Sequence, residues 1–343
     1  MMVFLVFAPI AGVKLCAAED VWTGVERIVA VGDVHGDYEH LVVVLRFAGI
    51  IDDQGNWSGG RTHLVQTGDI LDRGPEPRKA MDLLMKLERQ AKEAGGHVHA
   101  LIGNHETLNL LGNLQYVSPS DYASFQVEGS PETEPGRPRG YAERQRQFGP
   151  DGRYGKWIRS HNTVIRINDT VFLHGGIGPK YASYSIRWIN DRVREELSDF
   201  SRLPGGIVMD QEGPLWYRGM AKGDERTLGP LVVAVLKNFQ AGRIVIGHTF
   251  ADGAVTPRFG GQVLMIDVGL ARLYDTFIRQ SCLVIENGIP YALHRGTRLE
   301  LPSDGGKDML RYLQAAAALD PQPSSLEKRI ALLQSRLATG GNQ

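Results

Sequence analysis

The sequence RIVAVGDVHG at residues 27–36 decides the fold, because an apolar, strand-like run ends abruptly in a glycine-flanked acid and histidine. Asp33 and His35 stand two residues apart, so in extended backbone both side chains point to the same face, where the strand gives way to a loop. This geometry suits a shared metal ion. Gly32 and Gly36, on either side, permit a sharp turn and keep Cβ atoms from crowding whatever Asp33 and His35 bind. Taken alone, however, the pair fits an ordinary turn better.

The same pattern recurs four more times along the chain. The apolar runs HLVQ, VHALI, VFL and IVI lead into GDILDRG at 68–74, GNHE at 103–106, HGG at 174–176 and GH at 247–248. Five strand ends that each deliver oxygen or nitrogen donors are hard to attribute to chance. Open sheets bind ligands beyond the ends of their strands, so we expect these loops to converge on one crevice.

The five motifs, in this order, resemble the signature of the calcineurin-like metallophosphoesterases, specifically of the phosphoprotein phosphatase family. Ile102 precedes GNHE where the eukaryotic Ser/Thr enzymes usually carry Arg, and LMIDVG at 264–269 stands in place of their C-terminal Ser-Ala-Pro-Asn-Tyr segment. The chain therefore resembles the bacterial-type, Shewanella-like branch more closely. The order of strand and helix patterns indicates an α/β protein. The resemblance refines this to two mixed β-sheets packed as a central sandwich flanked by helices.

The resemblance implies a centre of two divalent metal ions. Cleavage of a phosphate ester needs two cations roughly 3.5–4 Å apart, which acidify a water and hold the phosphoryl oxygens. Mixed oxygen and nitrogen donors without thiolate favour Mn, Fe or Zn over Ca. The metal ligands that the resemblance implies are Asp33 and His35 for one ion, Asp69 as the bridge, and Asn104, His174 and His248 for the second.

The family assigns the residue that follows Asn104 to acid catalysis. His105 would protonate the leaving alkoxide or phenoxide, and Asp72 would orient it through the imidazole Nδ1. Glu106, the last residue of that motif, is expected to support the site rather than to perform chemistry.

Phosphate binding is expected from arginine. Arg73 offers a planar fork suited to two phosphate oxygens, and Asn104 is assigned to phosphate as well as to metal. A second arginine is expected between HGG and GH. Arg218, set between aromatic residues and Gly219, is the best-placed candidate, and the other arginines considered in this interval are Arg187, Arg192 and Arg243.

Composition and charge narrow the classes of partner. Hydrophobic residues make up 42% of the chain and charged residues 22%, which is typical of a folded globular protein. The formal net charge is -1 and no Lys/Arg block interrupts the chain, so neither nucleic acid nor a membrane surface is an expected partner. We also find no sign of an obligate protein partner.

Residues 1–18 are almost wholly apolar and end in small residues before an acidic pair, as a secretory signal with cleavage after Ala18 would. This predicts a periplasmic or secreted protein. The absence of Lys or Arg before the apolar run leaves a cytoplasmic protein with a buried N-terminal segment as the alternative. The run is too short for a membrane span, which needs about 20 residues. Cleavage would remove Cys16 and leave Cys282 without a disulfide partner.

The remaining chain divides into a catalytic domain at 19–300 and a C-terminal helical extension at 301–343. An insertion at 116–154 is rich in turn-forming residues, but its aromatics predict a partly ordered lid or subdomain beside the site. These aromatics are Tyr116, Tyr122, Phe125, Tyr141 and Phe148.

These features predict a metal-dependent phosphomonoester hydrolase that acts on phosphorylated proteins and prefers phosphotyrosine to phosphoserine or phosphothreonine. The preference rests on the branch that the chain resembles and on stacking of a phenol ring against the insertion's aromatics. The alternative is that these aromatics only pack the insertion. A dinucleoside-polyphosphate or other small-molecule phosphoesterase would share the metal core. A non-catalytic binding module would have lost ligands, and none is lost here.

Overall fold

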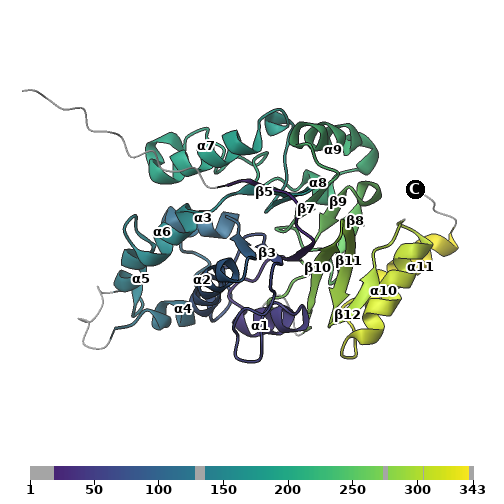
Figure 1. Cartoon of the computed structure of the whole chain (residues 1–343), viewed down its shortest axis with the longest axis horizontal. Helices are drawn as coiled ribbons and strands as arrows, with labels where there is room; N and C mark the ends of the chain where they lie inside the picture. Colours follow the sequence, from purple (N-terminus) through teal and green to yellow (C-terminus); the bar gives the residue numbers. More distant parts are fainter. Residues whose placement is uncertain (1–18, 128–135, 273–276, 304, 340–343) are drawn as a thin grey trace, which may run out of the picture.

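Two six-stranded sheets form the centre of the part of the chain that the structure describes (Figure 1). The structure is a computed structural model that describes residues 19–127, 136–272, 277–303 and 305–339. The first sheet has the order β1 (Val21–Trp22), β5 (Val164–Ile167), β6 (Thr170–Leu173), β7 (Arg243–Ile246), β9 (Val263–Met265) and β8 (Thr256–Arg258). The second has the order β12 (Thr297–Glu300), β11 (Ile289–His294), β10 (Ser281–Glu286), β2 (Arg27–Val31), β3 (His63–Gln66) and β4 (His97–Ala100).

Both sheets are mixed, and the motif-bearing strands are their parallel parts. β2, β3 and β4 run parallel, as do β6, β7 and β9, whereas β10, β11 and β12 are antiparallel to their neighbours. Parallel strands bring their carboxyl ends to the same edge of a sheet, so the loops that follow them meet there. The predicted α/β fold with two mixed sheets is confirmed.

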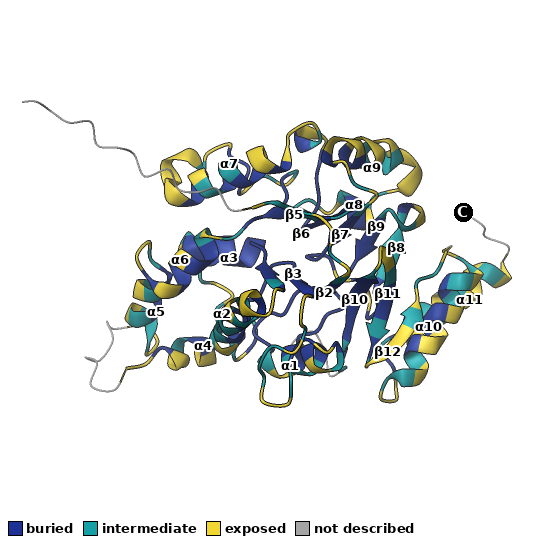
Figure 2. Ribbon diagram, viewed as in Figure 1, coloured by how far each residue is buried: buried dark blue, intermediate teal, exposed yellow. Residues whose placement is uncertain are grey.

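Strand β2 shows how the sandwich is held together. Ile28 and Ala30 pack in one core with Phe172 and Val245 of the other sheet. The alternate residues of β2 pack instead with apolar residues of the outer helices. Successive strand residues point to opposite faces, so the apolar residues 28–31 of β2 lie buried on both sides (Figure 2). Each fully buried Val, Leu or Ile contributes about 1.5–3 kcal/mol.

Helices cover the outer faces of both sheets (Figure 1). α1 (Tyr38–Phe47) and α2 (Pro77–Glu93) lie on the β2–β4 side, and α7 (Ile186–Ser198) and α9 (Glu225–Phe239) on the other. Pro77 opens α2 at a position where its missing N–H costs no hydrogen bond. The shorter helices are α3 (Asn104–Leu110), α4 (Pro119–Ser124), α5 (Tyr141–Phe148), α6 (Arg153–Arg159), α8 (Gly219–Lys222) and the 3-10 turns Pro179–Tyr181, Phe200–Arg202 and Phe259–Gly261.

The insertion has a small core of its own. Arg144 of α5 is fully buried, and it donates to Asp121 at 2.9 Å and to Asn109 at 2.6 Å. Phe125 and Phe148 are 1% and 3% exposed, and both contact the Tyr154 ring. The expectation that these two aromatics face a substrate was wrong, because they pack the insertion itself. Residues 128–135 of the insertion lie outside the described part.

Two helices end the described chain. α10 (Lys307–Leu319) contacts β12 and α11 (Glu327–Ala338). Across the described ranges we find no helix both long and apolar enough to traverse a bilayer. The predicted signal peptide lies outside the described residues and stays a prediction, as do the domain boundaries.

Candidate metal centre and active site

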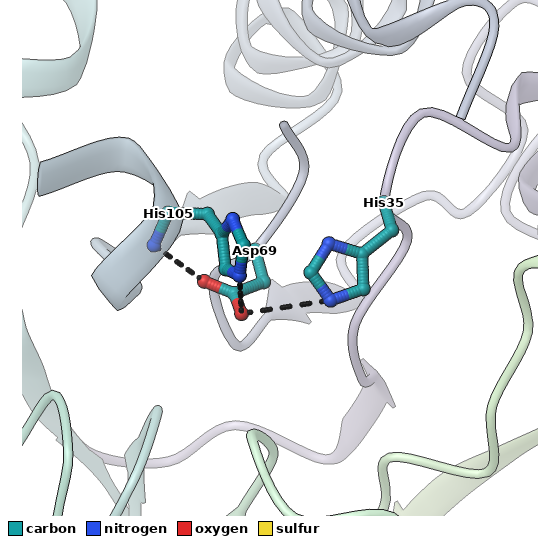
Figure 3. Close-up of side chains that lie close together, drawn as sticks. All are labelled: His35, Asp69 and His105. Carbon is teal, nitrogen blue, oxygen red and sulfur yellow. Dashed lines mark hydrogen bonds and ion pairs between the residues drawn. The ribbon is translucent and has the colours of Figure 1, made fainter. Parts of the chain in front are cut away.

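The predicted ligands come together at the ends of five strands. Asp33 and His35 follow β2, Asp69 follows β3, and Asn104 begins α3 after β4. From the other sheet, His174 follows β6 and His248 follows β7. All six are at most 7% exposed. Figure 3 shows Asp69 between His35 and His105.

The loops at this centre hold an unusual backbone. Positive φ values occur at His35 (45°), Asp69 (58°), Asp72 (69°), Arg73 (65°) and His248 (62°). A residue other than glycine in this region costs of the order of 1–3 kcal/mol, so it persists only where the surroundings enforce it. Five such residues in one place indicate loops held in shape for function.

Two glycines allow the backbone to approach the carboxylates. A Cβ atom on Gly103 would lie 2.4 Å from Oδ1 of Asp69, and one on Gly247 would lie 2.5 Å from Oδ1 of Asp33. Any side chain here would displace a ligand. These two glycines therefore leave room for the candidate ligands.

Hydrogen-bond acceptors converge on His174. Its Nδ1 donates to the carbonyl oxygen of Thr67 at 2.9 Å, so its Nε2 carries a lone pair. That Nε2 lies 2.9 Å from Oδ1 of Asn104 and 3.3 Å from Oδ2 of Asp69, which are also acceptors. Three acceptors this close repel one another unless a cation lies among them. The donor set therefore fits a metal ion.

Two of the candidate histidine ligands are held in the neutral form that binds metals. Burial lowers the pKa of His35 to about 3 and that of His248 to about 2. Nδ1 of His35 contacts the carbonyl of Leu71 at 3.0 Å, which leaves Nε2 facing the carboxylates. Nε2 of His248 is buried without a hydrogen-bond partner among the described residues. Groups of one acid and two histidines that could hold an ion are His35 with Asp69 and His105, and Asp69 with His174 and His248.

A sixth strand end adds a carboxylate that lies outside the five sequence motifs. Asp267 follows β9, is 3% exposed, and burial raises its pKa to about 6. Burial first, and then Asp267 and Asp69, also raise the pKa of Asp33. Buried carboxylates that repel one another again favour a bound cation. The signal was present in VLMIDVG, an apolar run that ends in an acid near a glycine, but the segment had served only to distinguish the branch.

Glu106 joins two of the loops. Its carboxylate accepts from the backbone N–H of Asp69 at 2.7 Å, of Ile70 at 2.9 Å and of Gly103 at 2.8 Å. The acid therefore fixes the loop of the bridging Asp69 to the loop that carries Asn104.

His105 lies between a carboxylate and an arginine. Its Nδ1 is 2.6 Å from Oδ2 of Asp72, and its Nε2 is 3.3 Å from Nη2 of Arg73. Burial acts in the opposite direction, but the carboxylates of Asp69 and Asp72 raise the pKa of His105. Geometry alone also groups His105 with His35 and Asp69. The structure thus places the predicted acid His105 against Asp72 and Arg73, the two residues that the sequence predicted beside it.

A cleft of about 1030 Å³ opens above this centre and is lined by His105, Arg73 and Arg218. Nη1 of Arg218 donates to the carbonyl of His248 at 2.8 Å and to Thr249 Oγ1 at 3.0 Å. The structure therefore brings the candidate Arg218 to the site. The cleft is not lined by Arg187, Arg192 or Arg243. Each of these arginines pairs with an acid elsewhere, Arg187 with Asp20, Arg192 with Glu196 and Arg243 with Asp169.

Comparison with known proteins identifies the family. The sequence profile described as Calcineurin-like phosphoesterase matches residues 26–252. The chain belongs to the calcineurin-like phosphoesterase family, and it is a metal-dependent hydrolase of phosphoesters.

Particular relatives support the predicted branch. Shewanella-like protein phosphatase 2 of Arabidopsis thaliana is 31% identical over 285 residues, which cover 72% of each chain. Shewanella-like protein phosphatase 1 of Plasmodium berghei is 29% identical and covers 66% of this chain and 62% of its own. Among solved structures, the cold-active protein-tyrosine phosphatase of a psychrophilic Shewanella species is 32% identical, with a TM-score of 0.70 over 82% of each chain.

Proposed function

We propose that this phosphoesterase is a protein phosphatase that removes phosphate from protein side chains and prefers phosphotyrosine to phosphoserine or phosphothreonine. The observation that carries the proposal is the 2.6 Å contact between His105 Nδ1 and Asp72, which directs the other imidazole nitrogen into a cleft flanked by Arg73 and Arg218. A proton donor beside two arginines suits a phosphomonoester whose leaving oxygen needs a proton. The relatives named as protein phosphatases agree with this assignment.

Each residue has a definite task in this reaction. Two divalent ions, of Mn, Fe or Zn, held by Asp33, His35, Asp69, Asn104, His174 and His248, would lower the pKa of a water and polarise the phosphoryl oxygens. Arg73 and Arg218 bind and orient the phosphate, with the amide of Asn104 beside it. His105 gives a proton from Nε2 to the leaving oxygen, and Asp72 positions the imidazole.

Arg73 couples phosphate binding to the proton donor. A guanidinium can only donate, so its contact with Nε2 at 3.3 Å requires that nitrogen to accept. When Arg73 turns to a phosphate oxygen, Nε2 is released to carry the acidic proton. Phosphate binding to Arg73 and protonation of His105 at Nε2 thus favour each other.

Tyr116 supports the preference for an aryl ester. It is 42% exposed, its ring centroid lies 5.0 Å from that of His105, and it lines the cleft. The Arg73 guanidinium lies 5.9 Å from the same ring. An aromatic edge beside the proton donor and the phosphate ligand is placed to contact a phenol ring.

The test begins with removal of the metals by a chelator and separate reconstitution with Mn, Fe and Zn. Phosphotyrosine and phosphoserine peptides of one sequence are then compared with diadenosine tetraphosphate. We expect peptide hydrolysis that depends on metal, with phosphotyrosine preferred. Faster cleavage of the dinucleotide would instead favour the small-molecule phosphoesterase, for which the cleft also has room.

Asp69→Asn tests the two-metal arrangement directly. We expect its turnover to fall at least about a thousandfold while the circular dichroism spectrum stays native, because this carboxylate would help to hold both ions. Full activity of the metal-loaded Asp69→Asn protein would contradict the proposal.

A further inference from the structure

The cleft above the metal centre extends to the C-terminal helix. Its lining includes His105 and Arg218 of the site and also Leu332, Leu333 and Arg336 of α11. Pockets of about 300–1,000 Å³ hold entire drug-sized ligands. At about 1030 Å³ this cleft therefore has room for much more than one phosphorylated side chain.

Helix α11 is fixed to the loop that carries a metal ligand. Nη1 of Arg329 donates to the carbonyl of Ala251 at 2.9 Å, three residues after His248. The backbone N–H of Ala251 donates in turn to the carbonyl of Asp267 at 2.7 Å. Leu326, just before α11, is fully buried. The helix therefore continues the wall of the active site.

We call the part of the cleft lined by residues of 222–225, 249–258 and 329–336 the distal wall. Two large apolar side chains are exposed on it. Phe250, two residues after His248, is 40% exposed, and Leu332 of α11 is 54% exposed. Both line the cleft. Exposed apolar side chains that line a cleft suit a ligand that has an apolar group of its own.

The charges of the distal wall favour an acidic ligand. Arg258 pairs with Glu225 at 3.0 Å, and Asp252 interacts electrostatically with Arg329. The exposed cations Lys222 and Arg336 also line the cleft and have no acidic partner among the described residues. The distal wall therefore carries a surplus of positive charge.

On the basis of the proposed function, we propose that this distal wall binds the polypeptide that flanks the phosphorylated residue. An apolar substrate side chain lies against Phe250 and Leu332, and an acidic one pairs with Arg336 and Lys222. The substrates are then phosphoproteins with acidic and apolar residues beside the phosphorylated side chain. Charges across such a surface set specificity more than absolute affinity.

The experiment uses phosphopeptides that differ only in the flank, which carries Glu, Ala or Lys. The full chain is compared with Arg336→Gln, and Gln334→Glu on the same helix is the control with an equal change of charge. Gln334 is exposed and does not line the cleft. We expect the wild type to favour the Glu flank over the Lys flank about tenfold in kcat/KM. Arg336→Gln should reduce this ratio about threefold, mainly through KM, and Gln334→Glu should leave it within twofold.

A second variant tests the apolar contact. Leu332→Ala should lower kcat/KM about threefold for a peptide with a leucine flank relative to its alanine counterpart. The inference would be overturned if the ratio of kcat/KM for the Glu-flank over the Lys-flank peptide were the same in wild type, Arg336→Gln and Gln334→Glu. The proposed function would still stand in that case. Hydrolysis of p-nitrophenyl phosphate but of no phosphopeptide would overturn both. Because these side chains are exposed, thermal midpoints near that of the wild type will show that each variant is folded.

Discussion

The Nδ1 atom of His105 lies 2.6 Å from the Oδ2 atom of Asp72. Asp72 is fully buried, and its other oxygen accepts from the side-chain amide of Asn109 at 2.9 Å. The carboxylate cannot swing away, so it holds the imidazole with Nε2 toward the cleft. A positioned proton donor of this kind contributes about 10²–10⁴ in rate.

We therefore expect Asp72→Asn to lower kcat about a hundredfold and His105→Ala to lower it further. The loss in His105→Ala should be larger for a phosphoserine than for a phosphotyrosine peptide, because the alkoxide needs the proton more than the phenoxide does. The ratio of kcat/KM for the two peptides, in wild type and variant, measures this. Unchanged rates in His105→Ala would show that the residue is not the acid.

Glu106→Gln should destabilise the fold as well as the site. The carboxylate accepts backbone N–H groups of two loops, and an amide cannot accept at both of its ends. We expect a loss of about 2–3 kcal/mol in the free energy of unfolding, measured by urea denaturation. Glu93→Gln, an exposed change near the end of α2, is the control and should cost less than about 0.5 kcal/mol. Equal losses in the two variants would contradict the role of Glu106.

That the six candidate ligands converge could be predicted from the sequence, because each follows an apolar strand and stands beside a glycine. The left-handed backbone at His35 and Asp69 could not be predicted, because residues other than glycine disfavour this conformation and only tertiary contacts enforce it. Asp267 was missed because a single acid before a valine and a glycine resembles a turn. The short helices of the insertion gave too little periodicity to show that Phe148 points inward.

Acid should destabilise the protein through a histidine cluster on β3 and β4. Nε2 of His99 lies 3.0 Å from Nδ1 of His63, and the His97 ring stacks on His99 at 4.2 Å. Burial lowers the pKa of His63 to about 4, and it lowers the pKa of His99 well below the usual 6.5. At a pH between these lowered pKa values and 6.5, the unfolded chain binds more protons than the folded protein does. The free energy of unfolding therefore falls as the pH falls below about 6.5.

His99→Gln removes one of these titrating groups. When the pH falls from 7.5 to 5.5, the free energy of unfolding should fall by about 1 kcal/mol less in the variant than in the wild type. The reason is that pH 5.5 lies one unit below the histidine pKa of 6.5 in the unfolded chain, and one such unit corresponds to about 1.4 kcal/mol. Urea denaturation of metal-depleted protein at both pH values measures this without a contribution from metal release. An identical loss in both proteins would mean that His99 does not titrate on unfolding.

Tyr116 is the aromatic residue of the insertion that we expect to affect substrate choice. Its ring lies beside His105, whereas Tyr141 lies 6.0 Å from the Tyr122 ring and does not line the cleft. One aromatic contact contributes about 0.5–1.5 kcal/mol, which is a factor of about 2–13. Tyr116→Ala should therefore lower the ratio of kcat/KM for phosphotyrosine over phosphoserine peptides by a factor in this range.

The ratio of kcat/KM for the two peptides is more informative than either value alone. Phenoxide leaves more readily than alkoxide, whatever Tyr116 contributes. That intrinsic difference is the same in every variant, so it cancels when the ratio for Tyr116→Ala is divided by the ratio for the wild type. Tyr141→Ala is the control, and it should leave the ratio unchanged. If both variants keep the wild-type ratio, the preference comes from the leaving group alone and the wall of the cleft does not select the phenol ring.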